Sequence, residues 1–210
     1  MDMSFDISSN LLVAGETGTG KTYFLKALIK KITQNSDSEA NIYIDDPKEF
    51  EYRRLLNGTN IRPYDEDEAT SLMESRLLAI KENKEAEFPP VYVIFEEFSH
   101  RLNWLKEADE KDEDNDIGDR LLSLCDRTSC KKANVHLVCT SQVPHLLLSS
   151  TQVRAIFDFL AICYYGNQNP FEQGYFSKPW QENLKTAIEA IGEEDYGEWH
   201  LIVYRLKGRE

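Results

Sequence analysis

The chain has 210 residues, 41% of them hydrophobic, and carries 37 acidic against 24 basic side chains, for a net charge of −13. This length predicts one domain, spanning residues 1–210, with a full hydrophobic core, and no apolar run is long enough to cross a membrane. The first ten residues contain neither a basic segment nor an apolar one, so we expect no signal peptide and a cytoplasmic protein, while the negative charge disfavours general binding to nucleic-acid phosphates.

The first informative segment runs from residue 11 to residue 32. Leu11 to Ala14 form a short apolar run typical of a buried strand, and apolar residues recur at helical spacing from Thr22 to Ile32. Between them lies Gly-Glu-Thr-Gly-Thr-Gly-Lys-Thr, which fits the phosphate-binding pattern G-x-x-x-x-G-K-[ST]. We therefore expect this loop and the first helical turn to bind a nucleotide through Gly15, Glu16, Thr17, Gly18, Thr19, Gly20, Lys21, Thr22 and Tyr23.

Two side chains of this loop have specific expected roles with ATP. Glycines allow successive backbone N–H groups to point at phosphate oxygens, and the helix N-terminus adds partial positive charge. Lys21 should contact the β- and γ-phosphates, and the Thr22 hydroxyl should bind Mg²⁺. A glycine-rich turn that merely caps a helix is the alternative interpretation.

The rest of the chain alternates between strand-like and helical patterns. We predict further strands at 41–44, 91–95, 135–140, 159–165 and 200–206, and helices at 66–83, 117–130 and 181–191. This alternation predicts an α/β fold with a mostly parallel central sheet flanked by helices. An acidic segment at about 106–117 is expected to be a solvated loop.

The strand at 91–95 ends in two acids, Glu96 and Glu97. In a parallel sheet both carboxylates would lie at the C-terminal edge, where open α/β sheets bind their ligands. We expect Glu96 to hold the Mg²⁺ shell through water, and Glu97 to orient and deprotonate the water that attacks the γ-phosphate. The pattern therefore predicts a hydrolase. The alternative is a pair of acids that simply extend from a strand end into solvent.

The strand at 135–140 leads into Ser141 and Gln142. A glutamine at this edge can hydrogen-bond both the γ-phosphate and the surrounding water, so Gln142 could sense which nucleotide is bound. Polar residues at strand ends are common, and this interpretation depends on the two preceding segments.

The four cysteines show no C-x-x-C spacing, and three lie in or beside apolar segments: Cys125, Cys130, Cys139 and Cys163. This pattern favours buried free thiols over zinc or disulfides, and the four histidines form no ligand cluster with them. Mg²⁺ is the one metal that the sequence predicts.

The order of these segments resembles the FtsK/HerA-type motor ATPases over nearly the whole chain. The resemblance is carried by Asn-Leu-Leu-Val-Ala before the loop, by Asp45-Asp46-Pro47-Lys48, by Val-Ile-Phe-Glu-Glu-Phe at 93–98 and by the segment 131–144. Within that superfamily, Gly-Lys-Thr-Tyr-Phe at 20–24, Val153-Arg154 and Phe157-Asp158-Phe159 are most similar to coupling ATPases of Gram-positive conjugative elements.

The resemblance implies a RecA-like core that binds ATP and Mg²⁺ and assembles into a ring, usually a hexamer, which threads DNA through its channel. ATP would lie between subunits, with Arg154 of the neighbour as the candidate arginine finger, unless it is an ordinary surface arginine. Candidate DNA contacts are Arg127, Lys131 and Lys132, which could instead serve only the helix dipole. The resemblance also implies partners such as a membrane channel or a relaxase-type protein, which would recruit the motor to the membrane.

Three residues depart from the family pattern and leave alternatives open. Glu96 stands where the family has Asp, Val143 where it commonly has Arg, and Lys131 where it often has Arg. A viral genome-packaging ATPase, a protein-export ATPase of the same superfamily and a weakly hydrolysing nucleotide-dependent switch are the alternatives. The acidic surface would suit the export ATPase better than a DNA motor.

Overall fold

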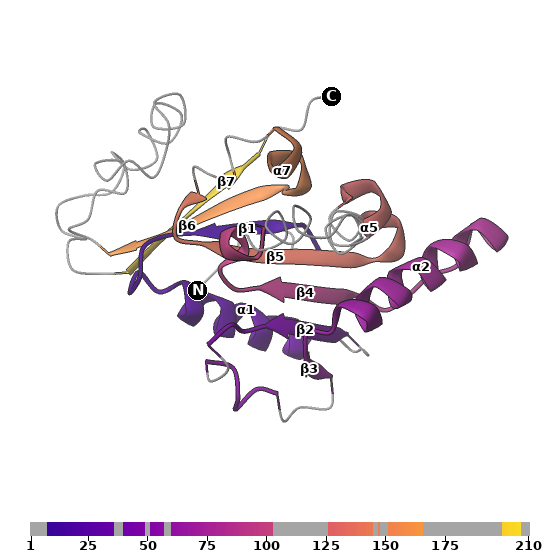
Figure 1. Ribbon diagram of the computed structural model, residues 1–210, viewed down its shortest axis with the longest axis horizontal. Coiled ribbons are helices and arrows are strands. Elements are labelled where there is room, and N and C mark those ends of the chain that lie inside the picture. Colours follow the sequence, from indigo (N-terminus) through magenta and orange to yellow (C-terminus); the bar gives the residue numbers. More distant parts are fainter. Residues whose placement is uncertain are drawn as a thin grey trace, which may run out of the picture.

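One sheet forms the centre of the computed structural model, which describes residues 8–35, 40–48, 51–56, 60–102, 126–144, 147, 151–165 and 199–206. Within these residues the sheet has seven strands in the order β3-β2-β4-β5-β1-β6-β7 (Figure 1). Neighbours among the first six pair in parallel, and β7 runs antiparallel to β6. The strands are β1 (Leu11–Ala14), β2 (Asn41–Asp45), β3 (Ile61–Pro63), β4 (Val91–Phe95), β5 (Val135–Ser141), β6 (Phe159–Tyr165) and β7 (Trp199–Arg205).

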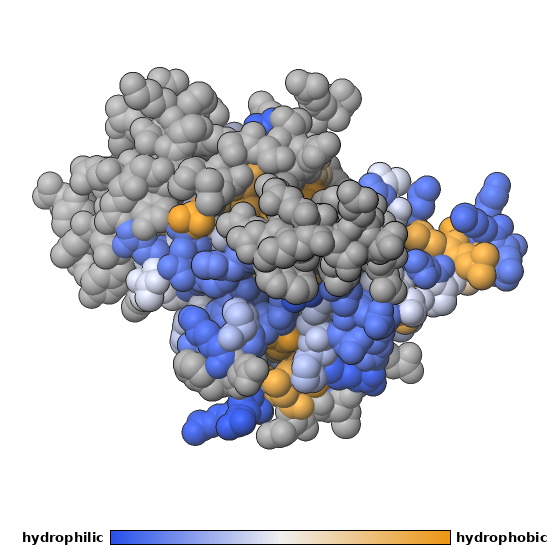
Figure 2. All heavy atoms as spheres, viewed as in Figure 1, coloured by the Kyte–Doolittle hydropathy of each residue, from blue (hydrophilic) through white to orange (hydrophobic). Residues whose placement is uncertain are grey.

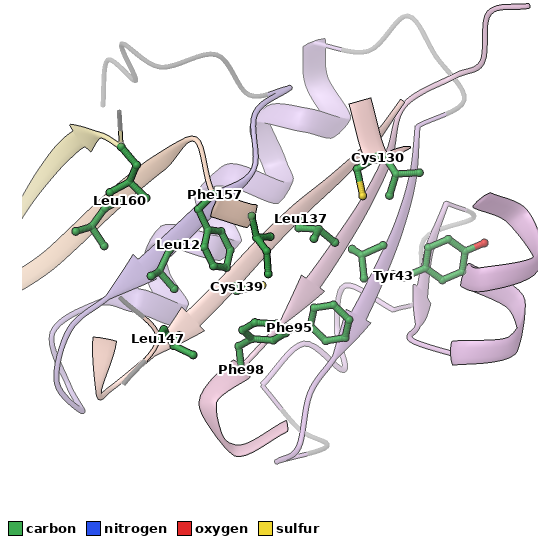
Figure 3. Close-up of a cluster of buried hydrophobic side chains, with 14 of the residues drawn as sticks. Leu12, Tyr43, Phe95, Phe98, Cys130, Leu137, Cys139, Leu147, Phe157 and Leu160 are labelled. Atoms are coloured by element: carbon green, nitrogen blue, oxygen red, sulfur yellow. The ribbon is translucent and has the colours of Figure 1, made fainter. Parts of the chain in front are cut away.

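Helices cover both faces of this sheet, which confirms the predicted α/β class. Side chains alternate between the faces along β1: Leu11 and Val13 pack against α1 (Lys21–Asn35), whereas Leu12 and Ala14 belong to the opposite cluster. That second cluster includes side chains of α2 (Glu66–Glu82), α5 (Arg127–Ala133) and α7 (Thr151–Ile156). Figure 3 shows its centre, where aromatic and aliphatic side chains of β1, β4 and β5 meet.

Several element boundaries differ from those that the pattern predicts. Asp126, inside the helix expected at 117–130, is not helical: its extended backbone and its side-chain contact with the Ser129 N–H (2.8 Å) make it the N-cap of α5. Asn134 ends α5 in the left-handed conformation, with φ of 54°. The strand β3 and the helix α7 are present in the structure but were not predicted. β3 buries a single residue, so its sequence offers no alternating pattern.

Other predicted features lie outside the described residues. These are the first part of the helix at 117–130, the helix at 181–191 and the acidic loop at about 106–117. No helix in the described part of the chain combines the length and the hydropathy that a membrane span requires.

The sheet order brings three strand ends together at one edge. β5 lies between β1 and β4, with Ala14 paired to Ser141 and Phe95 paired to Cys139. All three strands run in the same direction, so the segments that follow them emerge side by side at the C-terminal edge. Gly15, Glu96 and Gln142 are therefore the first residues after three adjacent strands, β1, β4 and β5.

A buried asparagine fixes the opposite, N-terminal edge. The Asn10 Oδ1 accepts from the Leu137 N–H at 2.9 Å, and its Nδ2 donates to the Ile156 carbonyl at 2.9 Å. Its backbone N–H donates to the buried Asp158 carboxylate at 3.1 Å. The side chain of Asn10 thus joins the start of β1 to β5 and to the end of α7, and its backbone N–H joins it to the residue before β6.

On the face that Figure 2 shows, the described residues are mostly hydrophilic, as the net charge suggests. The far end of α2 extends beyond the sheet and carries hydrophobic colour, and Leu78 on this helix is 57% exposed. Tyr23 is the other large hydrophobic side chain that stands out among the described residues, at 76% exposure. It lies on the first turn of α1, beside the phosphate-binding loop.

Candidate functional site

The phosphate-binding loop, residues 15–22, is tethered to the two strands that flank β1. The Gly15 N–H donates to the Ser141 carbonyl of β5 at 3.2 Å. A Cβ at Gly15 would overlap the Cys163 carbonyl oxygen of β6, so only glycine permits this close approach. Gly18 and Gly20 have φ of 86° and 93°, which side-chain-bearing residues rarely adopt. The three glycines of the motif therefore each meet a backbone requirement.

Lys21 lies folded over this loop. Its Nζ donates to the Gly15 carbonyl at 2.7 Å and to the Glu16 carbonyl at 2.9 Å. Burial lowers the pKa of Lys21, and the Glu97 carboxylate opposes this shift by favouring the charged amine. A poorly solvated ammonium held in place at the base of a loop is well suited to bind phosphate oxygens.

A cavity of about 660 Å³ opens beside the loop. This volume lies in the range of small-molecule binding sites. The loop and the first turn of α1 form one wall, while the ends of β4 and β5 contribute Glu96, Glu97 and Gln142. Lys48, Glu51, Cys163 and Leu201 complete the lining. Of the residues predicted for ATP binding and hydrolysis, the structure places residues 17–23, Glu96, Glu97 and Gln142 around one space.

The Thr22 hydroxyl and Glu96 meet at the base of the cavity. Thr22 Oγ1 donates to Glu96 Oε1 at 3.0 Å, and the Tyr52 hydroxyl lies 3.5 Å from the same oxygen. The Glu96 Oε2 is buried with no hydrogen-bond partner among the described residues. Burial raises the pKa of Glu96, and the hydrogen bond from Thr22 opposes the rise.

These oxygen atoms fit Mg²⁺. A hydroxyl and a carboxylate are hard ligands, and Mg²⁺ is commonly held by one or two carboxylates together with substrate phosphates. The described residues contain no group of three or more His, Cys, Asp or Glu side chains that could enclose a metal by themselves. A site completed by the phosphates of a nucleotide agrees with both observations, and the bare Glu96 Oε2 is an available ligand.

Glu97 has an unusual backbone for a residue with a side chain. Its φ is 57°, in the left-handed region. Its N–H donates to Thr140 Oγ1 of β5 at 2.9 Å, and Thr140 is fully buried. Left-handed geometry at a non-glycine residue costs on the order of 1–3 kcal/mol and is found where function requires it. We infer that the Thr140 hydroxyl holds this conformation and so sets the direction of the Glu97 side chain.

Gln142 connects the phosphate-binding loop to Glu97. Its Nε2 donates to Glu97 Oε1 at 2.7 Å, and its Oε1 accepts from the Thr17 hydroxyl at 2.9 Å. An ionised carboxylate can only accept, so the Glu97 contact fixes which end of the amide faces Thr17. The Glu97 Oε2 is buried and has no hydrogen-bond partner within the described ranges. No described donor therefore occupies that oxygen.

The other predicted site residues lie away from the cavity. Arg154, which is half-buried, lies on α7 ahead of β6, and the Asn10 contact with Ile156 places this helix at the N-terminal edge of the sheet. Lys131 is at that edge too, where its Nζ lies 3.4 Å from the Asp158 carboxylate. Lys132 is exposed on the same helical turn, and the side chain of Arg127 lies outside the described part.

Sequence reasoning missed several residues of the site, among them Lys48, Tyr52, Thr140 and Cys163. Lys48 and Tyr52 approach it from the segment after β2, and Thr140 and Cys163 from β5 and β6. The Asp-Pro-Lys turn was a visible signal for Lys48, whereas only the folded chain reveals the others. Burial raises the pKa of Cys163 to about 12. The prediction that the cysteines are buried is confirmed for Cys130, Cys139 and Cys163, and Cys125 lies outside the described residues.

Comparison with known proteins gives one family and a group of similar folds. Residues 1–154 match the family model described as the central domain of the helicase HerA. No curated protein sequence matches the chain. Among solved structures, the genome packaging NTPase B204 from Sulfolobus turreted icosahedral virus 2, in complex with ATP-gammaS, has a TM-score of 0.57 and 15% identity over 96% of this chain and 94% of that one.

Two further structures resemble this chain as part of longer proteins. The cytoplasmic domain of the Thermomonospora curvata type VII secretion ATPase EccC has a TM-score of 0.61 and 14% identity over 95% of this chain and 25% of that one. The pCW3 conjugation coupling protein TcpA, in its monomer form with ATPgS, has a TM-score of 0.60 and 16% identity over 95% and 57%. At such identities the likeness concerns the fold, and it confirms the predicted RecA-like P-loop architecture.

Proposed function

Because the chain belongs to the family of the HerA helicase central domain, within the FtsK/HerA-type P-loop ATPases, we propose that it hydrolyses ATP to move DNA. The observation that carries this proposal is the convergence of three strand ends on one cavity. β1 supplies Lys21 and Thr22 through its loop, β4 supplies the two glutamates, and β5 supplies Gln142. These are the parts that phosphoryl transfer to water requires: a phosphate cradle, ligands for Mg²⁺ and a base.

The proposed reaction assigns one role to each group. Backbone N–H groups of the loop and the Lys21 ammonium would bind the phosphates, and Thr22 and Glu96 would hold Mg²⁺, which would supply positive charge to neutralise the phosphates. Glu97 Oε2 accepts the proton of the attacking water. Gln142 keeps Glu97 Oε1 occupied, so that the other oxygen of the carboxylate faces the water. The bond from the γ-phosphorus to the ADP oxygen then breaks.

We propose a ring, with a hexamer as the expected form, in which Arg154 completes the cavity of the neighbouring subunit. The support is geometric: Arg154 lies at the sheet edge opposite the loop, so it cannot serve the cavity of its own chain without a large rearrangement. Lys131, Lys132 and Arg127 remain proposed DNA contacts, although Lys131 is partly neutralised by Asp158. Conjugative transfer, with a membrane channel or relaxase-type partner, is the proposed process.

Two other functions have specific support. The similar fold of a genome packaging NTPase, matched over most of both chains, favours DNA packaging as a second candidate. The similar folds of EccC, one of them solved with a signal sequence peptide, and the net charge of −13 favour protein export. A nucleotide-dependent switch that scarcely hydrolyses ATP has weaker support. It rests only on Glu96 and Val143, which differ from the residues that the family has at these positions.

DNA binding in defined nucleotide states distinguishes a DNA motor, for transfer or for packaging, from a protein-export ATPase. With so acidic a chain, the grip on DNA must come from a few basic residues focused in an assembled channel. Fluorescence anisotropy should therefore show weak binding of duplex DNA by dilute protein and tighter binding once a non-hydrolysable ATP analogue promotes assembly, measured in parallel by mass photometry. Affinity should fall steeply with salt, and less steeply for the Lys131→Ala, Lys132→Ala double variant. Assembled protein that binds no DNA even at low salt would instead support export.

A further inference from the structure

A second lysine, Lys48, lines the cavity beside Glu96. It belongs to the turn after β2, and β2 lies next to β4 with Asp45 paired to Phe95. The Glu96 N–H donates to the Asp45 carbonyl at 3.1 Å, so the backbone of the turn begins directly against the backbone of Glu96. The cavity thus receives one lysine from the phosphate-binding loop and another from a different strand end.

The position of Lys48 is set by a braced turn. Asp46 Oδ1 accepts from the Lys48 N–H at 3.1 Å, and Asp46 Oδ2 accepts from the Tyr52 N–H at 3.3 Å. Pro47 between them restricts the backbone further. Tyr52 is fully buried, and its hydroxyl reaches Glu96. The base of the Lys48 side chain is therefore fixed, although the side chain itself is exposed.

The ammonium of Lys48 is available to a ligand. Within the described ranges it has no carboxylate oxygen within 4.0 Å, whereas Lys26 nearby is paired with Glu51 at 3.5 Å. The positive charge of Lys48 nevertheless acts across the site, since it contributes to lowering the pKa of Lys21 and opposes the rise in the pKa of Glu96. Lys48 is thus a cation with no ion pair among the described residues, and it lines the same cavity as Lys21 and Glu96, the space in which the phosphates of a nucleotide would lie.

We propose that Lys48 is a catalytic residue that donates to the γ-phosphate of ATP bound by the same chain. Lys48 would stabilise the negative charge on the γ-phosphate oxygens while the bond from water oxygen to phosphorus forms, the bond to the ADP oxygen breaks and Glu97 takes the proton. This inference rests on the proposed ATPase function. It gives each chain a cation of its own at the γ-phosphate, in addition to any arginine from a neighbour.

The competing explanation is that Lys48 only offsets the charge of Glu96. That role would affect every nucleotide bound with Mg²⁺, whereas a γ-phosphate contact affects ATP alone. Binding of ATPγS and of ADP, each measured with Mg²⁺ by calorimetry, separates the two. Lys48→Ala should lower affinity for ATPγS by about tenfold or more and leave that for ADP within about twofold. Lys48→Arg should keep part of the ATPγS affinity, because its charge and donors remain.

Turnover supplies the second readout. Lys48→Ala should reduce kcat by at least about tenfold with thermal unfolding unchanged, as expected for lost stabilisation of transition-state charge. Lys30→Ala, which removes an exposed charge of α1 away from the cavity lining, should match the wild type and serves as the control. Mixing Lys48→Ala protein with Lys21→Ala protein should restore no activity. Both lysines of a cavity come from the same chain, so every cavity in a mixed assembly would still lack one of them.

Distinct results would overturn the inference. Wild-type kcat and wild-type ATPγS affinity in Lys48→Ala would do so, as would equal losses for ATPγS and ADP. Recovery of activity in the mixture would show that Lys48 acts on a neighbour instead. If the proposed ATPase function itself is wrong, the wild-type protein will hydrolyse no ATP. The affinities of wild-type and Lys48→Ala protein for ATPγS and ADP can still be compared in that case.

Discussion

Replacing Glu97 with glutamine should reduce the turnover of ATP by about 100-fold or more and leave ATP binding nearly intact. Glutamine has the same shape and can still contact Gln142, but it cannot take a proton at the position of the bare Oε2. Phosphate release at saturating ATP, together with calorimetric affinity for ATPγS, measures both halves of this expectation.

Two companion variants test the geometry behind it. Thr140→Val removes the acceptor of the Glu97 N–H and leaves a buried donor unpaired, which costs about 1–3 kcal/mol, so kcat should fall while Thr140→Ser retains most of it. Glu96→Gln should act mainly on the Mg²⁺ dependence. If Glu96→Gln abolished turnover and Glu97→Gln did not, the assignment of the base to Glu97 would be wrong.

Replacing Lys21 with alanine should weaken the binding of ATP with Mg²⁺ by a few kcal/mol, or about 100-fold in affinity. The Lys21 side chain is buried and already oriented by two loop carbonyls, so a contact with phosphate would be a charge-assisted hydrogen bond shielded from solvent. Lys30→Ala is the matched control, since it removes the same charge from the exposed face of the same helix. Unchanged nucleotide affinity in calorimetry would contradict the assignment of the phosphate-binding loop.

Much of the fold follows from short apolar runs in the sequence. The boundaries of β1, β4 and β6 agree with the runs that predict them, because a strand buried on both faces needs a continuous apolar segment. The helix expected at 117–130 was wrong at Asp126, where an aspartate compatible with the helical pattern serves as an N-cap. β3 was missed because a short edge strand carries too few buried residues to form a pattern.

Some residues of the site could be predicted from local sequence patterns, and others depend on contacts between distant segments. Lys21, Thr22, Glu97 and Gln142 were predicted because a motif or a strand end marks each of them, and the sheet brings them to one cavity. Their individual roles stay predictions. The Thr140 contact could not be predicted, because it depends on the register between β4 and β5 and on the left-handed backbone of Glu97.

The placement of the basic residues revises how the DNA hypothesis must work. Arg154 and Lys131 lie at the N-terminal edge of the sheet, away from the cavity. If they act in catalysis or in DNA binding, they do so at contacts with another subunit or within a channel formed by several copies. The motor hypothesis therefore depends on assembly more strongly than the sequence alone indicates.

The most direct test of an ATPase that moves DNA is the rate of phosphate release from ATP by assembled protein at low salt, with and without duplex DNA. The structure and the family lead us to expect measurable hydrolysis without DNA, a clear increase when DNA is added, and loss of that increase as salt rises. Glu97→Gln protein provides the background rate. Assembled protein that hydrolyses ATP at one rate with or without DNA would contradict the motor and leave the ATPase standing, and a wild-type rate equal to that of Glu97→Gln would contradict both.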